Sequence, residues 1–296
     1  MAKFLKKYWV TMLLYLVLLI GLCLLLYPGV SNWWNTLHQS RAIASYVETV
    51  EDMDGEKIDA MLNEARVYNE QLAGKKINLL LTGEEQAGYE SVLDVSDTGI
   101  MGYVRIPKLH SSQPIYHGTD ETVLQVAVGH IPGTSFPIGG ESTHSVLSGH
   151  RGLPSAKLFT DLDQMQEGDL FMVTVLNQTV TYKVDQIRIV DPEDVSELQI
   201  IPGEDYCTLV TCTPYGINTH RLLVRGVRIE NIEERFGVID DAVRISPYVV
   251  IVLAGIPALL AALAVLRVYF RRRRKPKTEE ELMDGLKTLL EKEIDS

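Results

Sequence analysis

The sequence is short of cysteine and of positive charge. Its 296 residues include only three cysteines, and Cys207 and Cys212 lie five residues apart in one apolar run. Side chains alternate along a strand, so these two should face opposite sides of a sheet, which argues against a disulfide between them. Acidic residues outnumber Lys and Arg by 39 to 28, a net charge of -11, so we expect no nucleic acid or other polyanionic partner.

Metal ligands at a usable spacing and internal repeats are also missing. The cluster of Asp52, Asp54 and Gly55 resembles a calcium loop, but the further ligands that such a loop needs are absent. We therefore expect no metal there. No repeat is visible along the chain, which excludes a repeat architecture.

Long hydrophobic runs are confined to two blocks, residues 9–27 and 248–266, each of 19 residues without a charge. At about 1.5 Å rise per residue, such a helix nearly crosses a ~30 Å hydrocarbon layer. The first block lacks a small-residue cleavage signature, which favours a retained anchor over a cleaved signal peptide. Trp33 and Trp34 lie where an interfacial aromatic belt is expected.

Positive charges precede the first block and follow the second. Lys3, Lys6 and Lys7 precede the first block, and the basic run 271–275 follows the second. Because positive flanks stay in the cytoplasm, we expect a two-pass membrane protein with both termini cytoplasmic and the chain between them extracytoplasmic. Nucleic-acid binding by the basic run is the weaker alternative, since the run adjoins an apolar block.

The segment between the two blocks divides into a helical part and a β-rich part. Residues 32–74 show helical periodicity broken at Asp54 and Gly55, which predicts two helices joined by a turn. Short apolar runs separated by turn residues then predict seven or eight strands, in a closed barrel or a sandwich. The predicted strands are 101–106, 123–128, 145–149, 170–176, 180–190, 206–211 and 222–229.

These patterns predict seven consecutive parts. They are a cytoplasmic N-terminus (1–8), a first transmembrane helix (9–27), an extracytoplasmic helical extension with a possible lid (28–98), a catalytic β-barrel (99–235), a linker (236–247), a second transmembrane helix (248–270) and a cytoplasmic tail (271–296).

One cysteine is placed to act as a nucleophile. Cys212 ends an apolar run just before a turn, whereas Cys207 fits a core position and Cys23 a filler within the first span. His150 stands at another strand end beside a glycine turn and could carry a proton. Arg221 begins the next strand, where a hairpin would return its guanidinium toward the sulfur to hold an oxyanion. Metal binding, structural roles and the other histidines remain alternatives.

The motifs around these residues resemble the sortases, membrane-anchored cysteine transpeptidases of Gram-positive bacteria. TLVTC at 208–212 and SGHRG at 148–152 match the family's signatures, and an arginine stands nine residues past the cysteine. The longer runs GYVRIPKL, PIYHGT and GHIPGTSFPIGGESTHSVLSGHRGLPSAKLFTDLD resemble the pilus-assembling class C branch. The resemblance implies a mainly β fold, an eight-stranded sortase-type β-barrel with an N-terminal helical extension and two transmembrane helices.

The resemblance also implies a reaction. Cys212 would be the nucleophile, His150 the general acid/base and Arg221 the oxyanion stabiliser. The substrate would be a pilin carrying a Leu-Pro-x-Thr-Gly-like sorting signal, cleaved between Thr and Gly and transferred to a lysine of the next pilin. No metal or organic cofactor is required. The alternatives are a housekeeping sortase that anchors proteins to the cell wall, a thiol peptidase, and a non-catalytic pilin scaffold.

The chain departs from the class C pattern in one segment. Class C sortases often carry a lid with an Asp-Pro-aromatic motif, yet this sequence has no proline between Pro28 and Pro107. Residues 79–99 contain Tyr89 as their single aromatic residue, and their Gly and Asp residues predict a flexible connection. We therefore expect Cys212 to be accessible in the resting enzyme.

Overall fold

The computed structural model describes residues 2–95, 98–231 and 283. Side chains are described from Leu13 onward and at Trp9. The predicted second transmembrane helix, the linker before it and almost all of the tail lie outside these residues. The two-pass topology therefore stays a prediction.

The first helix, α1 (Ala2–Glu51), includes the first apolar block and continues without a break for 24 residues beyond Tyr27. Its segment Leu13–Glu51 is the one helix in the described part of the chain that is long and apolar enough to cross a membrane. The most apolar window of this segment is not buried against protein, so its side chains are available to lipid.

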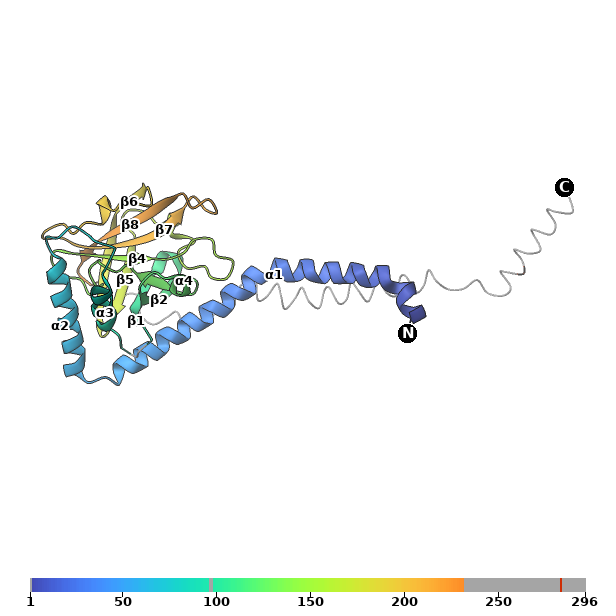
Figure 1. Ribbon diagram of the computed structural model, residues 1–296, viewed down its shortest axis with the longest axis horizontal. Helices are drawn as coiled ribbons and strands as arrows, with labels where there is room; N and C mark the ends of the chain where they lie inside the picture. Colours follow the sequence, from blue (N-terminus) through green and yellow to red (C-terminus); the bar gives the residue numbers. More distant parts are fainter. Residues whose placement is uncertain (1, 96–97, 232–282, 284–296) are drawn as a thin grey trace. The chain divides into compact units, whose positions relative to one another are not determined.

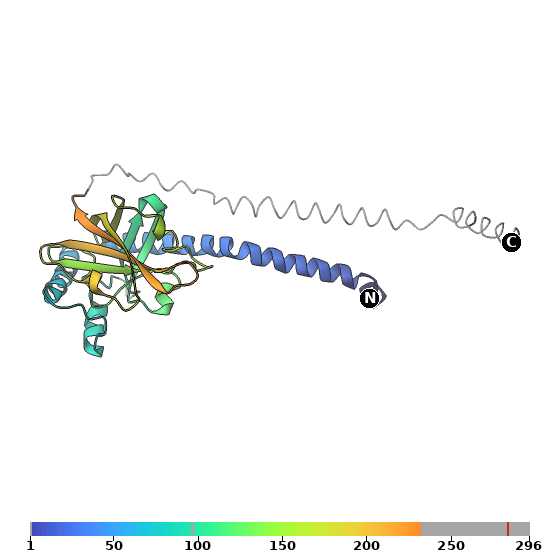
Figure 2. The same cartoon turned by 90° about the horizontal axis from the view of Figure 1, so that it is seen from above.

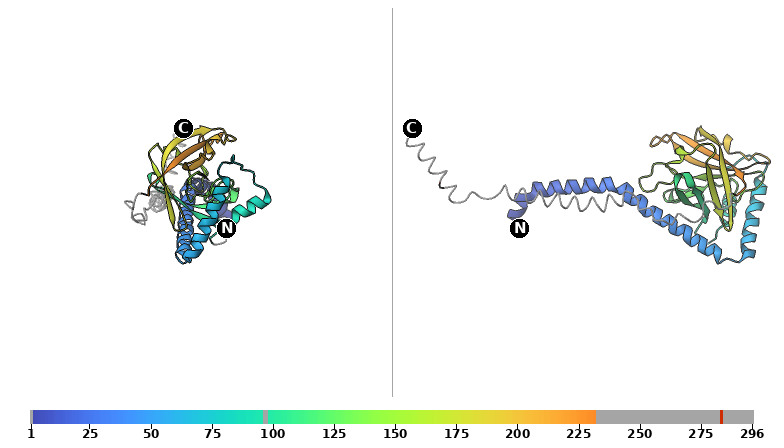
Figure 3. Two further views of the ribbon diagram at one scale, coloured as in Figure 1. Left: turned by 90° about the vertical axis from the view of Figure 1, so that its left-hand side faces the viewer. Right: turned by 180° about the vertical axis from the view of Figure 1, so that it is seen from behind.

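Two shorter helices follow α1. Helix α2 (Gly55–Leu72) begins where the Asp54 carboxylate accepts a hydrogen bond from the Glu56 N–H, so the predicted break at Asp54 is confirmed. Its buried residues Ile58, Leu62 and Ala65 join the barrel core, and α2 lies along the barrel (Figure 3). Helix α3 (Gly83–Ser91) begins with a reciprocal capping box between Thr82 and Glu85.

Eight strands close into a barrel in the order β1-β2-β3-β4-β7-β8-β6-β5 (Figure 1, Figure 2). The eight-stranded barrel that the resemblance implied is therefore confirmed. Strands β2 and β3, and strands β4 and β7, are parallel, and the other pairs are antiparallel. The strands are β1 (Ile100–Ile106), β2 (Ser111–His117), β3 (Val128–His130), β4 (Thr143–Ser148), β5 (Leu170–Val175), β6 (Gln178–Val190), β7 (Asp205–Thr213) and β8 (His220–Ile229).

Short helices fill some of the connections between strands. They are η1 (Pro107–Leu109), α4 (Glu121–Leu124), η2 (Leu162–Gln164) and η3 (Ser196–Leu198). The strand predicted at 123–128 is wrong for its first part, because Asp120 precedes a helical turn there and only Val128 continues into β3. Strand β2 was missed because its sequence begins with polar residues and contains Pro114, features that weaken a strand pattern.

The C-terminal end of α1 is fixed to the barrel by a buried tyrosine. The Tyr46 hydroxyl donates to the Met101 carbonyl at 2.8 Å and accepts from the Leu176 N–H at 2.7 Å. Burial raises the pKa of Tyr46, so the phenol stays neutral and makes both bonds. One hydroxyl thus joins α1 to the start of β1 and to the turn after β5.

We predict that Tyr46→Phe lowers stability without changing the fold. Phenylalanine fills the same space but leaves the buried Leu176 N–H without a partner, which costs about 1–3 kcal/mol. The measurement is thermal unfolding of the full chain in detergent, with Tyr27→Phe as the control, because Tyr27 is exposed in the apolar segment. Equal midpoints for both variants would show that the hydroxyl does not hold α1 to the barrel.

Candidate active site

The alternation of side chains along β7 separates its two cysteines. Cys207 is fully buried in the barrel core, and burial raises its thiol pKa, which keeps it in the unreactive neutral form. Cys212 is partly exposed at the other end of the same strand, and both cysteines are free thiols. The predictions that Cys207 is a core residue and that the two form no disulfide are confirmed.

Strand pairing places Cys212 opposite Arg221. In the antiparallel β7–β8 pair the two residues are direct register partners, as are Val210 and Leu223 two residues further along. Directly opposed residues of an antiparallel pair have Cβ atoms about 4.5–5.5 Å apart and point to the same face. The predicted return of the arginine to the cysteine is therefore confirmed at the level of the backbone.

The Arg221 guanidinium lies against its own loop. Its Nη1 donates to the His220 carbonyl at 3.2 Å and to the Asn218 carbonyl at 3.4 Å. These are long bonds to exposed acceptors, and both use Nη1, so they do not occupy the other N–H donors of the guanidinium.

The third predicted residue, His150, comes just after β4, which brings it to the same end of the barrel as Cys212. Ser148 pairs with Val210 in the parallel β4–β7 ladder, so the chain two residues on reaches the level of Cys212. Gly149 fixes this position, since its N–H donates to the Val210 carbonyl at 3.0 Å and its carbonyl accepts from the Thr211 hydroxyl at 2.7 Å. The two strands that flank β7 therefore position the other two candidate residues: β4 positions His150, and β8 carries Arg221.

The His150 ring has a nitrogen left for chemistry. Its Nε2 is buried and has no hydrogen-bond partner among the described residues, although a buried polar atom is normally paired. The Glu121 carboxylate at the start of α4 lies 3.8 Å from Nε2. The sequence did not point to Glu121, because 29 positions separate it from His150 and only the fold brings them together.

A second residue that the sequence analysis missed is Arg151. Its side chain is only 8% exposed, and its Nη1 donates to the Thr213 hydroxyl at 3.0 Å. Its Nη2 contacts the Asp163 carboxylate at 2.5 Å. Arg151 follows His150 and Thr213 follows Cys212, so this guanidinium ties the histidine loop to the cysteine strand. The sequence feature that could have indicated Arg151 is its position as a cation directly after His150 in a glycine turn.

An apolar strip on the outside of the barrel leads to Cys212. It consists of Val146, Val210 and Leu223 on three adjacent strands and of Leu198 from η3, all buried. Val210 stands two positions before Cys212 and so faces the same side of β7. Ile77 covers the strip, and its N–H donates to the Gln199 side chain at 3.1 Å.

The prediction of a flexible connection over residues 79–99 is wrong where the structure describes them. Helix α3 occupies part of this segment, and Tyr89 is fully buried against Phe136 and His130. The Tyr89 hydroxyl bonds to His130 Nδ1 at 2.9 Å and accepts from the Gly118 N–H at 3.1 Å. Burial lowers the pKa of His130 to about 3, so this contact is made by a neutral ring. The composition of this segment indicates a loop, but packing of Tyr89 against the barrel gives it a defined structure.

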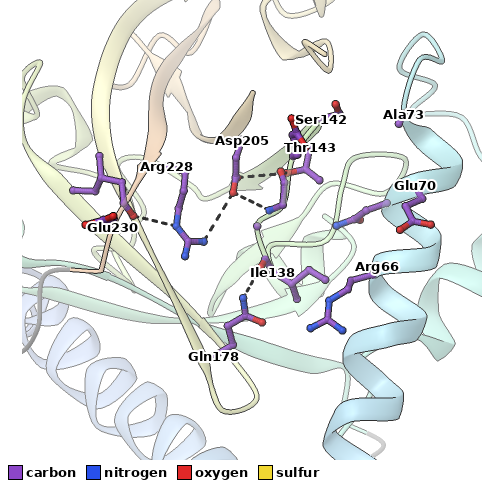
Figure 4. A pocket seen from close by; sticks show the side chains of 15 residues that line it. Arg66, Glu70, Ala73, Ile138, Ser142, Thr143, Gln178, Asp205, Arg228 and Glu230 are labelled. Atoms are coloured by element: carbon purple, nitrogen blue, oxygen red, sulfur yellow. Dashed lines mark hydrogen bonds and ion pairs between the residues drawn. The ribbon is translucent and has the colours of Figure 1, made fainter. Parts of the chain in front are cut away.

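A hollow of about 780 Å³ in the described part of the chain lies away from the three predicted site residues. It lies between α2 and the ends of β4, β7 and β8 that are remote from Cys212, with Asp205, Thr143 and Arg228 facing Arg66 and Glu70 (Figure 4). Asp205 is held there by the Gly140 N–H, the Tyr182 hydroxyl and Thr143, and burial raises its pKa. None of the three predicted site residues lines this hollow.

We predict that Arg151→Ala lowers the rate at which iodoacetamide alkylates Cys212 near neutral pH several-fold. Without the guanidinium the histidine loop is no longer tied to Thr213, and a thiol reacts faster when an imidazole is held beside it. Arg151→Lys should retain part of the rate and of its pH profile. The control is Lys157→Ala, an exposed cation of the same loop that pairs with Asp161. An unchanged profile in Arg151→Ala would remove its positioning role.

We also predict that Ile77→Ser accelerates alkylation of Cys212 several-fold. The substitution removes the apolar contact that Ile77 makes with the strip, which includes Val210 two positions before the thiol. Leu80→Ser is the matched control, since Leu80 belongs to the same segment but is 86% exposed. Equal rates in both variants and the parent would mean that the segment does not restrict the thiol and that Cys212 is open at rest.

Comparison with known proteins gives a consistent assignment. The profile of the Sortase domain family matches residues 104–229. The sortase C1 structure from Streptococcus agalactiae is 53% identical, with the match covering 65% of this chain and 100% of that one at a TM-score of 0.64. Sortase C of Streptococcus pneumoniae is 43% identical, covering 64% and 96% at a TM-score of 0.58.

Curated relatives match over a shorter part. Sortase D of Bacillus subtilis is 30% identical over 131 residues, which cover 43% of this chain and 63% of that protein. Sortase A of Streptococcus agalactiae is 31% identical over 117 residues, covering 38% and 47%. The chain thus spans less than two thirds of these curated relatives. With the full-length matches to the solved structures, the chain belongs to the sortase family, on the side of its class C enzymes.

Proposed function

We propose that this protein is a membrane-anchored cysteine transpeptidase that polymerises pilins. The observation that carries the proposal is the strand register, in which Cys212 lies opposite Arg221 on β8 and level with His150 after β4. A nucleophile, a proton carrier and an oxyanion donor at one sheet edge are the groups that acyl transfer through a thioester requires.

In the first step the Cys212 sulfur attacks the Thr carbonyl of a Leu-Pro-x-Thr-Gly-like sorting signal. Arg221 donates N–H groups to the oxyanion, and the Thr–Gly bond breaks as His150 gives its proton to the leaving glycine amine. The Thr carbonyl is now a thioester on Cys212. In the second step a lysine amine of another pilin attacks that thioester, loses a proton to His150 and forms an isopeptide bond as the sulfur leaves. The reaction is redox-neutral and needs no metal or organic cofactor.

The apolar strip supports this choice of substrate. Val146, Val210 and Leu223 offer buried aliphatic surface next to Cys212, which suits the Leu and Pro that precede the Thr of the signal. Ile77 occupies this surface in the present structure, so a sorting signal would displace it.

Class C neighbours support the pilus role. The solved Streptococcus pneumoniae sortase C is described in terms of pilin substrate specificity, and another neighbour is a pilus-related sortase C of Group B Streptococcus. Anchoring of surface proteins to the cell wall is the alternative, and it differs only in the acceptor amine. Hydrolysis of the same thioester by water would make the protein a thiol peptidase.

The location we propose is the cell membrane, with the barrel outside the cytoplasm. Helix α1 supplies one candidate span, and the apolar block at 248–266 supplies a second in the sequence. A protein held in this way meets pilins that are still tethered by their own tails.

The proposal predicts that Cys212→Ala, His150→Ala and Arg221→Ala each reduce turnover of a sorting peptide by several orders of magnitude. The three groups act as one unit, so a double variant should be no worse than the worst single one. Cys207→Ala is the control: it creates a small cavity in the core and should cost stability but little activity. Retained turnover in any of the three would remove that residue from the mechanism.

The products distinguish the candidate reactions. The full chain is incubated with a sorting peptide and a lysine-bearing pilin peptide, and the products are weighed by mass spectrometry. An isopeptide-linked product supports pilin polymerisation, whereas free carboxylate alone indicates a peptidase. Transfer to a cell-wall peptide in preference to the lysine would indicate the housekeeping role.

A further inference from the structure

Three amide side chains of α1 hold the two segments that surround His150. The Asn32 side-chain oxygen accepts from the Lys157 N–H at 2.7 Å, and the Asn35 amide donates to the Ser155 carbonyl at 2.7 Å. Both Lys157 and Ser155 belong to the loop that follows His150. The Gln39 amide donates to the Val126 carbonyl at 2.6 Å, just after the helix that carries Glu121.

The position of these amides on α1 sets the height of the active site above the membrane. Asn32, Asn35 and Gln39 are spaced three and four residues apart and so share one helix face. Asn32 is five residues past Tyr27, the end of the apolar block, which is about 7.5 Å along a helix axis. That distance is within the headgroup region of a bilayer, and the neighbouring Trp33 and Trp34 are about half exposed.

The loop between β7 and β8 joins the same end of the barrel. The Tyr215 ring packs over Gly152 of the histidine loop, where an added Cβ would come within 3.0 Å of the ring. Beyond it the loop is open: Tyr215 is 61% exposed and Ile217 is 67% exposed. Residues 214–221 contain no acidic side chain that would be repelled by anionic lipid.

We propose that the active-site end of the barrel rests on the outer surface of the bilayer, with Tyr215 and Ile217 in the lipid interface. This inference rests on the proposed membrane anchoring through α1. A tyrosine and an isoleucine at the tip of a loop are suited to that layer, because one presents a polar end to water and the other an aliphatic end to the acyl chains. The scissile bond of a membrane-tethered signal would then reach Cys212 without leaving the interface.

The opposite end of the barrel provides the matched control. Ile201 lies four residues before the start of β7, whereas Cys212 is near its end, and Ile201 is 43% exposed. If the active-site end faces the lipid, a probe at Ile201 stays in water.

The test uses the full chain with Cys212→Ala and Cys23→Ala, which leaves buried Cys207 as the remaining native thiol. A single added cysteine, Ile217→Cys or Ile201→Cys, carries an NBD fluorophore, and the protein is placed in nanodiscs of phosphatidylcholine and phosphatidylglycerol. We expect nitroxide-labelled headgroups to quench the probe at 217 and shift its emission to the blue, and to leave the probe at 201 unchanged. Equal behaviour of the two probes in protein that has entered the nanodiscs overturns the proposal.

Failure of the anchor would be seen separately, as protein that does not co-purify with nanodiscs, and it would contradict both proposals.

A second experiment measures activity. Ile217→Ser in the otherwise native chain should turn over a soluble sorting peptide as the parent does, but turn over a lipid-anchored peptide several-fold more slowly. Ile201→Ser should change neither rate. Equal loss on both peptides would show a structural defect of the loop and contradict a role at the bilayer.

Discussion

The pairing of β7 with β4 on one side and β8 on the other is the constraint on which the site depends. Cys212 on β7, Arg221 on β8 and His150 just after β4 lie at one end of the barrel because the registers Cys212↔Arg221 and Ser148↔Val210 are fixed. A slip of one residue in either ladder would turn a partner to the other face of the sheet. The buried residues Val146, Val210 and Leu223 on the outside, and Cys207 and Leu209 in the core, hold that register.

The sequence allowed prediction of what depends on local pattern. Alternation along β7 was sufficient to assign Cys207 to the core and Cys212 to the outside, and the Asp54–Gly55 break placed the end of one helix and the start of the next. Features that depend on tertiary packing could not be predicted from the sequence. Residues 79–99 have a loop-like composition, yet Tyr89 has a partner cluster in His130, Phe136 and His117 that no local pattern reveals.

The same distinction applies to the site. Each of the three candidate residues stands in a recognisable local motif, whereas Glu121 and Arg151 gain their importance from contacts across the fold. The amides of α1 are a further case, because Asn32 and Asn35 look like ordinary polar positions on a helix until the loop after His150 is placed against them. The helix that carries the apolar block thus also holds the loop that follows the candidate histidine, His150.

The account as a whole depends on a covalent intermediate at one thiol. The most direct measurement is to mix the full chain with a sorting peptide in the absence of an acceptor amine, quench in acid and map the adduct by peptide mass spectrometry. The account predicts a thioester between the Thr carbonyl and Cys212, formed with loss of the glycine-containing tail and absent from Cys207. Turnover of the peptide with no adduct at Cys212, or an adduct on another residue, would contradict it.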